Sequence, residues 1–270
     1  MTKKQALRRL ASLTGGLFAT QAAAAAHCRR HGRPCLGKLI MSTGVAADTL
    51  LLYAVLVPNF PLLGKVYHHG NRNGNKVALT FDDGPRPPYT GQVLDALGAA
   101  GVRATFFVLG ENARRYPEAV RRIEAEGHRV ANHGMDHDIL MFASGAAALS
   151  QVMGAEAALR QAGVRDPALL FRAPHGWLSL PAHRAITRRG YRVVGWTKGV
   201  WDTANPGADR IVSRTSEVLA PGSILLLHDG WGGISAEDRS QTAAALPAII
   251  GEARSRGLEF ITVEEMMREA

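Results

Sequence analysis

From Lys76 onward, short apolar segments alternate with longer amphipathic segments, and this alternation constrains the fold more than any other feature. The apolar segments are rich in β-branched and aromatic residues, as strands buried on both faces should be. Glycines follow the amphipathic segments, which predict helices, for example at 112–126 and 144–161. Seven strands are predicted, at residues 77–82, 104–110, 128–132, 169–172, 192–196, 224–228 and 258–263. The pattern predicts an α/β fold with a parallel sheet that closes into a (β/α) barrel.

Five polar signatures each lie at the end of a predicted strand. They are residues 80–85 (TFDDGP), 133–137 (HGMDH), 172–176 (RAPHG), 196–202 (WTKGVWD) and 225–229 (LLLHD). In barrels of this type the functional groups gather at the carboxyl ends of the strands. We therefore expect the side chains of the five signatures to converge on one site.

Asp82 and Asp83 are adjacent carboxylates, followed by Gly84 and Pro85, which favour a turn. Neighbouring side chains of a strand point in opposite directions, but at a turn both can face one cleft. Two carboxylates this close repel each other unless a cation or a strong hydrogen bond takes up one charge. An isolated Asp-Asp-Gly is also typical of a cap or an Asx turn, so this pair is informative only together with the other signatures.

His133 and His137 are four residues apart. On a helical turn this spacing places both imidazoles on one face, as a shared metal ion requires. With one carboxylate, they predict a site of two histidines and one carboxylate, with open positions for water and substrate. This ligand set suits zinc hydrolases and also ferrous oxygenases, so the ligands alone leave the reaction open.

The remaining polar groups favour hydrolysis over oxygenation. Amide hydrolysis needs a general base for water and a general acid for the departing amine, and an oxygenase needs neither. Asp82 and Asp83 provide one carboxylate for the metal and one for the proton. His228 provides an acid at another strand end, and Asp202 provides a carboxylate to pair with it.

Three sequence blocks resemble the polysaccharide deacetylase family, the NodB-type enzymes of carbohydrate esterase family 4. They are residues 80–85, residues 104–110 (ATFFVLG), and Gly127-His128 leading into the histidine pair. The resemblance spans about residues 75–265. It implies a deformed seven-stranded (β/α) barrel that uses a divalent metal ion, usually Zn²⁺ with Co²⁺ or Ni²⁺ as alternatives, to hydrolyse N-acetyl groups of glycans.

The resemblance also implies roles for individual residues. Asp83, His133 and His137 would bind the metal ion, and Asp82 would be the general base. Arg172 would orient Asp82.

The acid side of the site follows from the same resemblance. His228 would be the general acid, supported by Asp202. The backbone N–H of His175 would help to stabilise the oxyanion. Leu226 would line the pocket for the acetyl methyl group, and Trp201 would form part of the groove wall.

Three positions depart from the family pattern. Gly134 lies where the family has Ser or Thr inside the histidine motif, and His175 replaces a Tyr. Asp202 is followed by Thr203 where the family has Trp, so we expect Trp201 to rebuild the hydrophobic wall. The metal, base and acid positions are intact, which predicts an active enzyme with an atypical substrate groove.

The net charge of +9 is concentrated at the N-terminal end of the chain. Residues 1–64 hold eight Lys/Arg and one acid, Asp48, whereas the other 206 residues hold 24 basic and 22 acidic side chains. The globular part is therefore nearly neutral, and we do not expect a nucleic-acid partner. The two cysteines, Cys28 and Cys35, form no disulfide framework and match no familiar zinc spacing, so we expect a flexible basic tether there.

Residues 39–57 form an apolar stretch of 19 residues, which is long enough to cross a bilayer although Asp48 interrupts it. The basic residues before it favour a cytoplasmic location for that side. We therefore expect residues 1–64 to be a basic segment with one transmembrane helix, and residues 65–270 to be a catalytic domain outside the cytoplasm. Two alternatives remain open: cleavage of a secretory signal at 10–26, and a buried helix at 39–57.

The leading hypothesis is a monomeric, membrane-tethered, metal-dependent hydrolase. Its substrates would be N-acetylated amino sugars of an envelope or exported polysaccharide, such as peptidoglycan or chitin. One alternative is a deacylase or deformylase of a lipid-linked sugar or another non-peptide amide. Another is a catalytically silent glycan-binding module, which Asp82 and His228 disfavour because binding alone does not require them.

Overall fold

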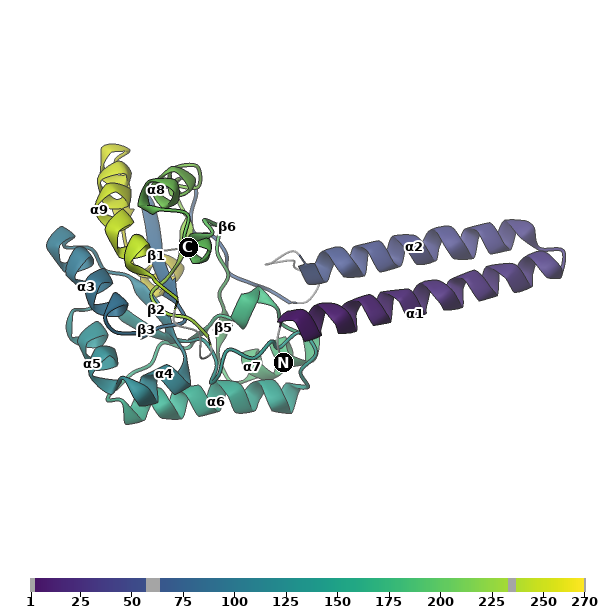
Figure 1. The fold of residues 1–270 in the computed structure, drawn as a ribbon, viewed down its shortest axis with the longest axis horizontal. Coiled ribbons are helices and arrows are strands. Elements are labelled where there is room, and N and C mark those ends of the chain that lie inside the picture. Colours follow the sequence, from purple (N-terminus) through teal and green to yellow (C-terminus); the bar gives the residue numbers. More distant parts are fainter. Residues whose placement is uncertain (1–2, 57–63, 233–236, 270) are drawn as a thin grey trace.

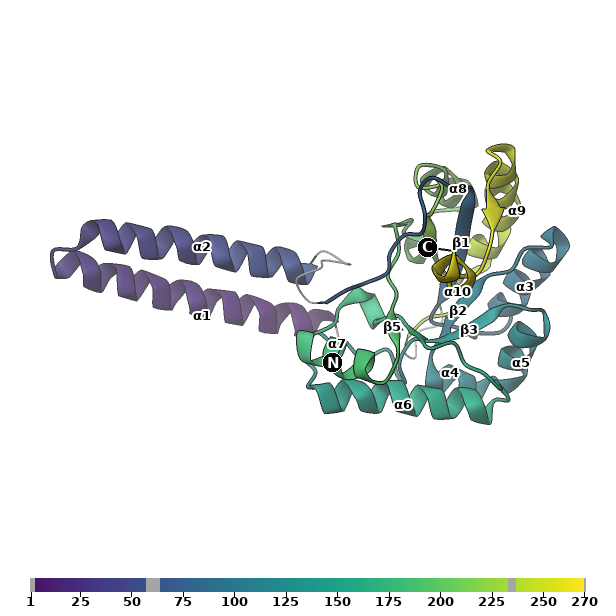
Figure 2. The ribbon, with the colours of Figure 1, turned by 180° about the vertical axis from the view of Figure 1, so that it is seen from behind.

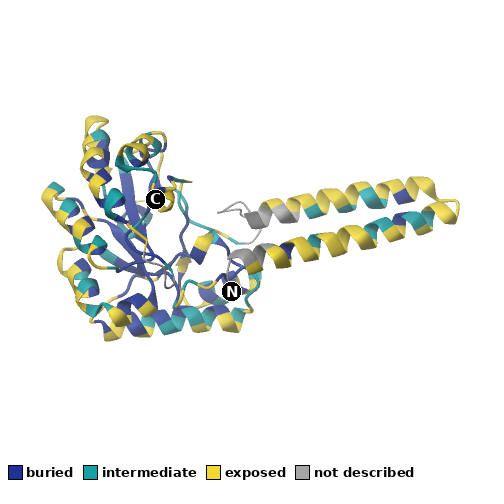
Figure 3. Ribbon diagram, viewed as in Figure 1, coloured by how far each residue is buried: buried dark blue, intermediate teal, exposed yellow. Residues whose placement is uncertain are grey.

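The computed structural model describes residues 3–56, 64–232 and 237–269. Within these ranges the chain forms an N-terminal pair of long helices and a parallel sheet covered by helices (Figure 1). Most strand residues are buried, whereas exposed residues dominate the N-terminal pair (Figure 3). The polar signatures all belong to the part that contains the sheet.

The parallel sheet has β1 (Lys76–Asp82) near its centre. The strand order is β5-β4-β3-β2-β1-β7-β6, and β8 pairs with the first residues of β1. The sheet curls as a half-barrel, with the helices on its outer side (Figure 2). The other strands are β2 Thr105–Val108, β3 Arg129–Asn132, β4 Leu170–Phe171, β5 Arg192–Val193, β6 Lys198–Gly199, β7 Ile224–His228 and β8 Glu259–Phe260.

All seven predicted strands are present, although most are shorter than expected. The strand β6 is an addition that apolar patterning does not predict, because it has two residues and one is a lysine. It pairs with Leu225 and Leu226 of β7. Hydrogen bonding to a neighbouring strand, rather than its own side chains, holds β6 in the sheet.

The expectation of a closed barrel is wrong for the part of the chain that the structure describes. The strands β5 and β6 lie at the two ends of the strand path, and only residues 194–197 connect them. A parallel pairing needs a crossover of about a dozen residues or more. Tyr67 lies beside β5 instead: its N–H donates to the carbonyl of Val193, and its carbonyl accepts from the N–H of Gly195.

Helices connect most of the strands and cover the outer face of the sheet (Figure 2). The predicted helix at 112–126 is two helices, because Pro117 restricts the residue before it and starts a new helix. Ser144 caps the next predicted helix through its hydroxyl group. The helices are α3 Tyr89–Ala100, α4 Gly110–Arg115, α5 Pro117–Ala125, α6 Gly145–Gln161, α7 Leu180–Arg188, α8 Ala208–Ser216, α9 Ser240–Ser255 and α10 Val263–Arg268, with short 3-10 turns at Pro174–Gly176 and Asp202–Ala204.

The alternation of side chains in β1 separates the main core from the site. Val77, Leu79 and Phe81 point into the core formed with α3, α5 and α9. The ring of Phe81 stacks on that of Phe106 at 5.0 Å between centroids. Burying each large apolar side chain contributes about 1.5–3 kcal/mol. The residues on the opposite face of β1 end with Asp82, so packing of the core fixes the direction in which this carboxylate points.

The N-terminal segment is an antiparallel helical hairpin of α1 (Lys3–Arg30) and α2 (Pro34–Leu56) (Figure 1). The expectation of a flexible tether is therefore wrong for the residues described here. The alanines at 22–26 favour helix, and the two helices pack closely. A Cβ atom on Gly37 would lie 2.8 Å from the Ala25 carbonyl oxygen.

The predicted transmembrane helix at 39–57 overlaps α2. Within the described residues, we find no helix that combines the length and the apolar character needed to cross a bilayer. Residue 57 lies outside the described residues, as do the side chains at 51, 52 and 54–56.

Candidate active site

The end of β1 places two carboxylates in one cleft, as the sequence predicts. Asp82 and Asp83 are 3% and 6% exposed, and Asp83 has a φ of 70°, which turns the chain and brings its carboxylate to the same side as that of Asp82. The next residue has no space for a side chain: a Cβ atom on Gly84 would lie 2.1 Å from a carboxylate oxygen of Asp229. The glycine of this signature is therefore a packing requirement.

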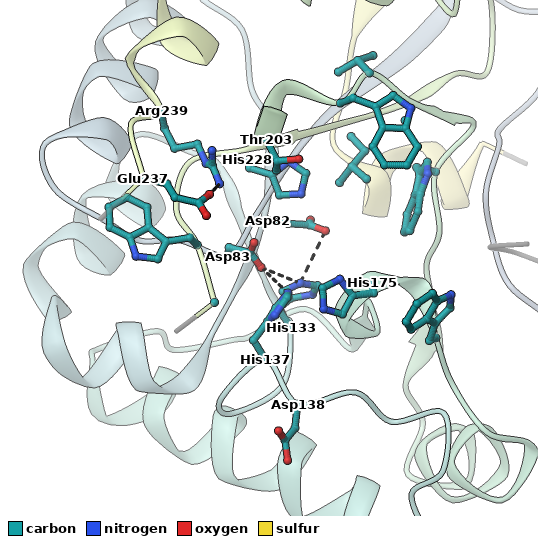
Figure 4. A pocket seen from close by; sticks show the side chains of 18 of the residues that line it. Asp82, Asp83, His133, His137, Asp138, His175, Thr203, His228, Glu237 and Arg239 are labelled. Carbon is teal, nitrogen blue, oxygen red and sulfur yellow. Dashed lines mark hydrogen bonds and ion pairs between the residues drawn. The ribbon is translucent and has the colours of Figure 1, made fainter. Parts of the chain in front are cut away.

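Asp83, His133 and His137 bring three potential metal ligands together (Figure 4). The Nε2 atoms of His133 and His137 lie 3.2 and 3.0 Å from Asp83 Oδ1. Within the described residues, this is the one group of three His, Cys, Asp or Glu side chains whose ligand atoms lie within 4.8 Å of one another. The predicted convergence of these residues is present in the structure.

The predicted helical turn for the histidine pair is wrong. Residues 133–137 form a loop after β3, and His137 has a φ of 63°. The loop is held from two sides: the Gly134 N–H donates to Asn132 Oδ1, and the N–H of Gly110 donates to the Gly134 carbonyl. Gly134 has a φ of 87°, a conformation that suits glycine better than the Ser or Thr of the family pattern.

The donor set fits a divalent cation. His133 Nδ1 lies 2.9 Å from the Arg172 carbonyl oxygen, which can only accept, so Nδ1 carries the proton and Nε2 offers a lone pair. Asp83 Oδ1 is buried and receives no hydrogen bond of good geometry, although two imidazole nitrogens surround it. A cation satisfies such an oxygen and two nitrogen lone pairs together.

The charge of Asp83 is set by competition between burial and the histidines. In the site without a cation, burial raises the pKa of Asp83, but the charge of protonated His137 and the contacts with both histidines outweigh burial and hold the pKa well below its usual range. Asp83 is therefore ionised at neutral pH. An ionised carboxylate is the form that binds metal.

Asp82 is held by Arg172, whose side chain is completely buried. Arg172 Nη1 donates to Asp82 Oδ1 at 2.6 Å and to Thr80 Oγ1 at 2.8 Å. Its Nη2 donates to the Gly195 carbonyl at 2.7 Å. The guanidinium group also packs over the Phe107 ring. These contacts fix the rotamer of Asp82 and leave Oδ2 directed toward His133, at 3.8 Å from its Nε2.

His228 and Asp202 form the second pair predicted from the sequence. Asp202 Oδ1 accepts from His228 Nδ1 at 2.8 Å, and Oδ2 accepts from the His228 N–H at 2.8 Å. The hydroxyl group of Thr242 donates to Oδ2 as well. Burial lowers the pKa of His228, but the Asp202 carboxylate outweighs burial and raises this pKa to about 9. His228 is therefore protonated at neutral pH.

A cavity of about 960 Å³ connects these groups (Figure 4). Arg172 and Asp202 do not line it and act from behind Asp82 and His228. The ring of His175 lies edge-on to that of His137, with centroids 4.6 Å apart. The cavity is lined by eight of the predicted site residues, namely Asp82, Asp83, His133, His137, His175, Trp201, Leu226 and His228, and also by Thr203.

Several residues that hold the site have no role predicted from the sequence. Asn112 Nδ2 donates to the Asp83 carbonyl at 2.7 Å, and Gln151 Oε1 accepts from the Met135 N–H. Thr90 donates to Asp229 Oδ2 at 2.6 Å. Asp229 directly follows His228, and its position at the end of a strand could have predicted a role in the site. Thr90, Asn112 and Gln151 lie on helices, where a single polar residue does not indicate a role in a site.

Comparisons with known proteins identify the family. Residues 69–194 match the profile of the family described as polysaccharide deacetylase. A peptidoglycan-N-acetylglucosamine deacetylase of Bacillus cereus is 37% identical over 198 residues, covering 73% of this chain and 90% of that protein. The chain is a polysaccharide deacetylase family member. A chitooligosaccharide deacetylase of a Bradyrhizobium species is 39% identical over 207 residues, covering 74% of this chain and 94% of that protein.

Solved structures of the polysaccharide deacetylase family share the fold. A crystal structure of a peptidoglycan N-acetylglucosamine deacetylase superimposes with a TM-score of 0.71 at 30% identity, covering 76% of this chain and 94% of that one. A family 4 carbohydrate esterase from Streptomyces lividans, in complex with acetate, gives 0.62 at 33% identity, covering 69% and 92%. The family prediction from the sequence is therefore confirmed.

Proposed function

We propose that this polysaccharide deacetylase hydrolyses N-acetyl groups of amino sugars in an envelope or exported polysaccharide. One observation carries the proposal: the candidate metal ligands, Asp82 and His228 line a single cavity. The relatives named above act on peptidoglycan N-acetylglucosamine and on chitooligosaccharides, by their names. These two substrates share the N-acetylglucosamine unit, which is the substrate class that we assign.

We assign Asp83, His133 and His137 to a divalent cation, with Zn²⁺ as the first choice and Co²⁺ or Ni²⁺ as alternatives. Two imidazoles and one carboxylate form a borderline-soft ligand set that suits all three ions. When bound, such an ion supplies Lewis-acid polarisation of the acetyl carbonyl and of water. The protein contributes the fixed position of Asp83, which is ionised, and the tautomer of His133.

The proton transfers are assigned to Asp82 and His228. Asp82 takes the proton from the attacking water through Oδ2, the oxygen that Arg172 does not occupy. His228 gives a proton to the departing amine nitrogen through Nε2, because Asp202 accepts from Nδ1. The two groups lie at the ends of adjacent strands, in register with each other. This arrangement lets them act on the same amide.

We assign the remaining predicted residues to substrate contacts. The backbone N–H of His175 is the proposed donor to the oxyanion, and Leu226 is the proposed contact of the acetyl methyl group. Trp201 is 69% exposed at the cavity, where its ring offers a face on which a sugar can pack. Trp177 and Trp196 also line the cavity. The tryptophans thus replace the wall that Thr203 cannot form.

We also propose the division of the chain and its location. Residues 65–270 would be the catalytic unit, which works as a monomer, and residues 1–64 would hold it at the cell envelope with the catalytic unit outside the cytoplasm. The transmembrane helix predicted at 39–57 is left out of this proposal, because no described helix is both long and apolar enough to cross a bilayer. The location is supported by the contrast between the basic N-terminal segment and the nearly neutral remainder.

The test is acetate release from peptidoglycan fragments and chitooligosaccharides by the purified protein. We expect release that a chelator abolishes and that Zn²⁺ or Co²⁺ restores, with the Asp82→Asn variant as the inactive control. Lipid-linked sugars, with formate measured beside acetate, test the alternative substrate class. Absence of acetate from every N-acetylated glycan, in a protein shown to contain the metal, would contradict the proposal.

A further inference from the structure

The helical hairpin carries most of the exposed apolar surface of the described residues. Ten large apolar side chains are exposed, and eight of them lie on α1 or α2, although these helices contribute only a minority of the chain. They are Leu13, Leu17, Phe18, Leu36, Leu39, Val45, Leu50 and Tyr53, with exposed fractions between 41% and 56%. Concentration of apolar side chains on one surface element marks an interaction surface.

The contact between α1 and α2 uses small and polar residues. Gly37 approaches the backbone of Ala25, and a Cβ atom on Gly44 would lie 2.3 Å from the side chain of Gln21. Gln21 Nε2 donates to Asp48 Oδ2 at 3.0 Å across the pair. A helical hairpin that is exposed only to water places its apolar residues between the helices. Here small residues and a polar bridge form the close approaches between them, as in helix pairs that meet lipid. Among the described residues of α1 and α2, Leu10 is the one large apolar side chain that is buried.

Four of the five exposed large apolar residues of α2 form an outward stripe. Leu36, Leu39, Leu50 and Tyr53 follow one another at intervals of three, eleven and three residues. At about 100° per residue these intervals keep the four side chains within about a quarter of the helix circumference. Gly37, Gly44 and Asp48, which face α1, fall on the other side of the helix by the same count. The stripe therefore points away from α1.

The outward surface is also basic. Six Lys/Arg side chains of the hairpin are described and all are exposed: Arg8, Arg9, Arg29, Arg30, Arg33 and Lys38. Four of these lie within residues 29–38, around the turn between the helices. The one acid of residues 1–64, Asp48, is engaged by Gln21. No carboxylate of the hairpin offsets the basic charge on its outer surface.

We propose that the hairpin is a docking surface for an anionic lipid bilayer. Exposed apolar side chains together with clustered basic ones match the two components of such a surface, acyl chains and negative headgroups. A second copy of this chain is a poorer partner, because two hairpins of equal positive charge repel each other. This inference does not depend on the proposed deacetylase activity, because it rests on exposed side chains of α1 and α2 and on none of the proposed catalytic or metal-binding residues.

Docking of the hairpin would bring the site close to the bilayer. Gln5, near the start of α1, lines the same cavity as His137 and His228. A bilayer-bound α1 therefore holds the cavity near the membrane. Release from the bilayer would move the cavity away from the membrane without changing the catalytic groups that line it.

The test is flotation of the full-length protein with vesicles of phosphatidylcholine alone and of phosphatidylcholine with 30% phosphatidylglycerol. We expect binding to the anionic vesicles that weakens as NaCl is raised, because salt screens the charges. Reversing three tip charges (Arg29→Glu, Arg30→Glu, Arg33→Glu) should weaken that binding by about tenfold or more. A matched control reverses three exposed charges of the sheet part (Arg114→Glu, Arg115→Glu, Arg165→Glu) and should leave binding unchanged within about twofold.

A second variant set tests the apolar stripe. Leu36→Ser, Leu39→Ser and Leu50→Ser change exposed positions, and they should also weaken vesicle binding while acetate release from a soluble oligosaccharide stays constant. Equal binding to neutral and anionic vesicles, or equal loss in the control, would overturn the proposal. A hairpin-dependent dimer in sedimentation, without vesicle binding, would assign the surface to a second copy instead.

Discussion

The ends of β1 and β7 lie side by side, and two titratable residues lie at each end. The second residue of each pair is an aspartate, and the two aspartates differ in their surroundings and in their pKa. Asp82 is in register with His228, so the two strands present Asp82-Asp83 and His228-Asp229 at the same edge. Both carboxylates of β1 line the cavity. Of the two residues at the end of β7, His228 lines the cavity, whereas Asp229 is 1% exposed and turns toward Thr90.

The difference shows that surroundings, not position at a strand end, decide the charge of a carboxylate. Burial raises the pKa of both Asp83 and Asp229. The histidines around Asp83 reverse this effect and keep it ionised. At Asp229, hydrogen bonds from the Thr90 hydroxyl group and from the backbone of Asp229 oppose burial only in part. The charges of Asp83 and Asp82 act in the same direction as burial, so the pKa of Asp229 rises to about 7. Asp83 is therefore ionised and able to bind a cation, whereas Asp229 is packed against Thr90.

The largest effect is expected from Asp83→Asn. Loss of the carboxylate removes the anionic ligand between the two histidines, so both metal content and acetate release should fall, activity by about 10⁴-fold or more. Metal analysis and a kinetic assay on the same sample check this. Retention of the metal by this variant would remove the basis for the comparison, because Asp83 would then be no more a ligand than Asp229.

The next effect is expected from Asp82→Asn. The amide keeps an acceptor for Arg172 but cannot take a proton from water, so the rate should fall by about 10²–10³-fold. Metal content should stay near that of the unmodified protein, since Asp83 and the histidines are unchanged. Arg172→Lys serves as the companion variant and should give a smaller loss of activity. A lysine keeps a positive charge near Asp82 but cannot make all three hydrogen bonds of Arg172. Full activity of Asp82→Asn would show that another group is the base.

A smaller effect, with a distinctive pH dependence, is expected from Asp202→Asn. The Asp202 carboxylate raises the pKa of His228 to about 9, against the effect of burial. Without it the pKa falls, and a general acid loses activity as the pH rises through its pKa. The alkaline limb of the rate profile should therefore move to lower pH, with about a 10- to 100-fold loss near neutrality. An unchanged alkaline limb would mean that His228 does not supply the proton.

The smallest effect on activity is expected from Asp229→Asn. It is the same substitution as Asp83→Asn, made at the end of β7 instead of the end of β1. We expect less than about a fivefold change in rate, or about 1 kcal/mol of barrier. A drop comparable with that of Asp83→Asn would contradict the division between the two strand ends.

The same variant should change stability in a pH-dependent way. The pKa of Asp229 is higher in the folded protein, about 7, than in the unfolded chain, about 4, so the folded state binds more protons between these values. Stability of the unmodified protein should therefore fall as pH rises from about 4 to 7, and Asp229→Asn should remove this part of the fall. The pH dependence of stability is measured by the melting temperatures of the unmodified protein and of Asp229→Asn, both free of metal, at pH 5 and pH 8. An equal difference at both values would refute the raised pKa.

Much of the fold could be predicted because its signals are local. Each of the seven predicted strands is a short apolar run, and Gly127, with a φ of 81°, follows the end of α5 as the sequence indicates. The errors concern contacts between distant residues. β6 depends on β7, the open edge depends on Tyr67, and the hairpin depends on Gly37 meeting Ala25. Hydrophobic periodicity does not specify which residues of different elements meet in such contacts.

The candidate site divides in the same way. The residue types of the five signatures determined that a carboxylate pair, a histidine pair and a separate histidine would be present, because each signature directly follows an apolar strand. The tertiary structure alone decided that both histidines meet one oxygen of Asp83, with the pair in a loop rather than on a helix. It also decided that Asp229 belongs to the packing around Gly84 and Thr90.

The order of residues along the chain specifies which chemical groups lie at the ends of the strands and where the positive charge is concentrated. Which of those groups are charged, and which residues meet, depends on how the chain folds. Composition and hydrophobic periodicity act over a few residues along the chain. Burial, hydrogen bonding and charge–charge interactions act through space, between residues such as Asp202 and His228 that folding brings to within 2.8 Å.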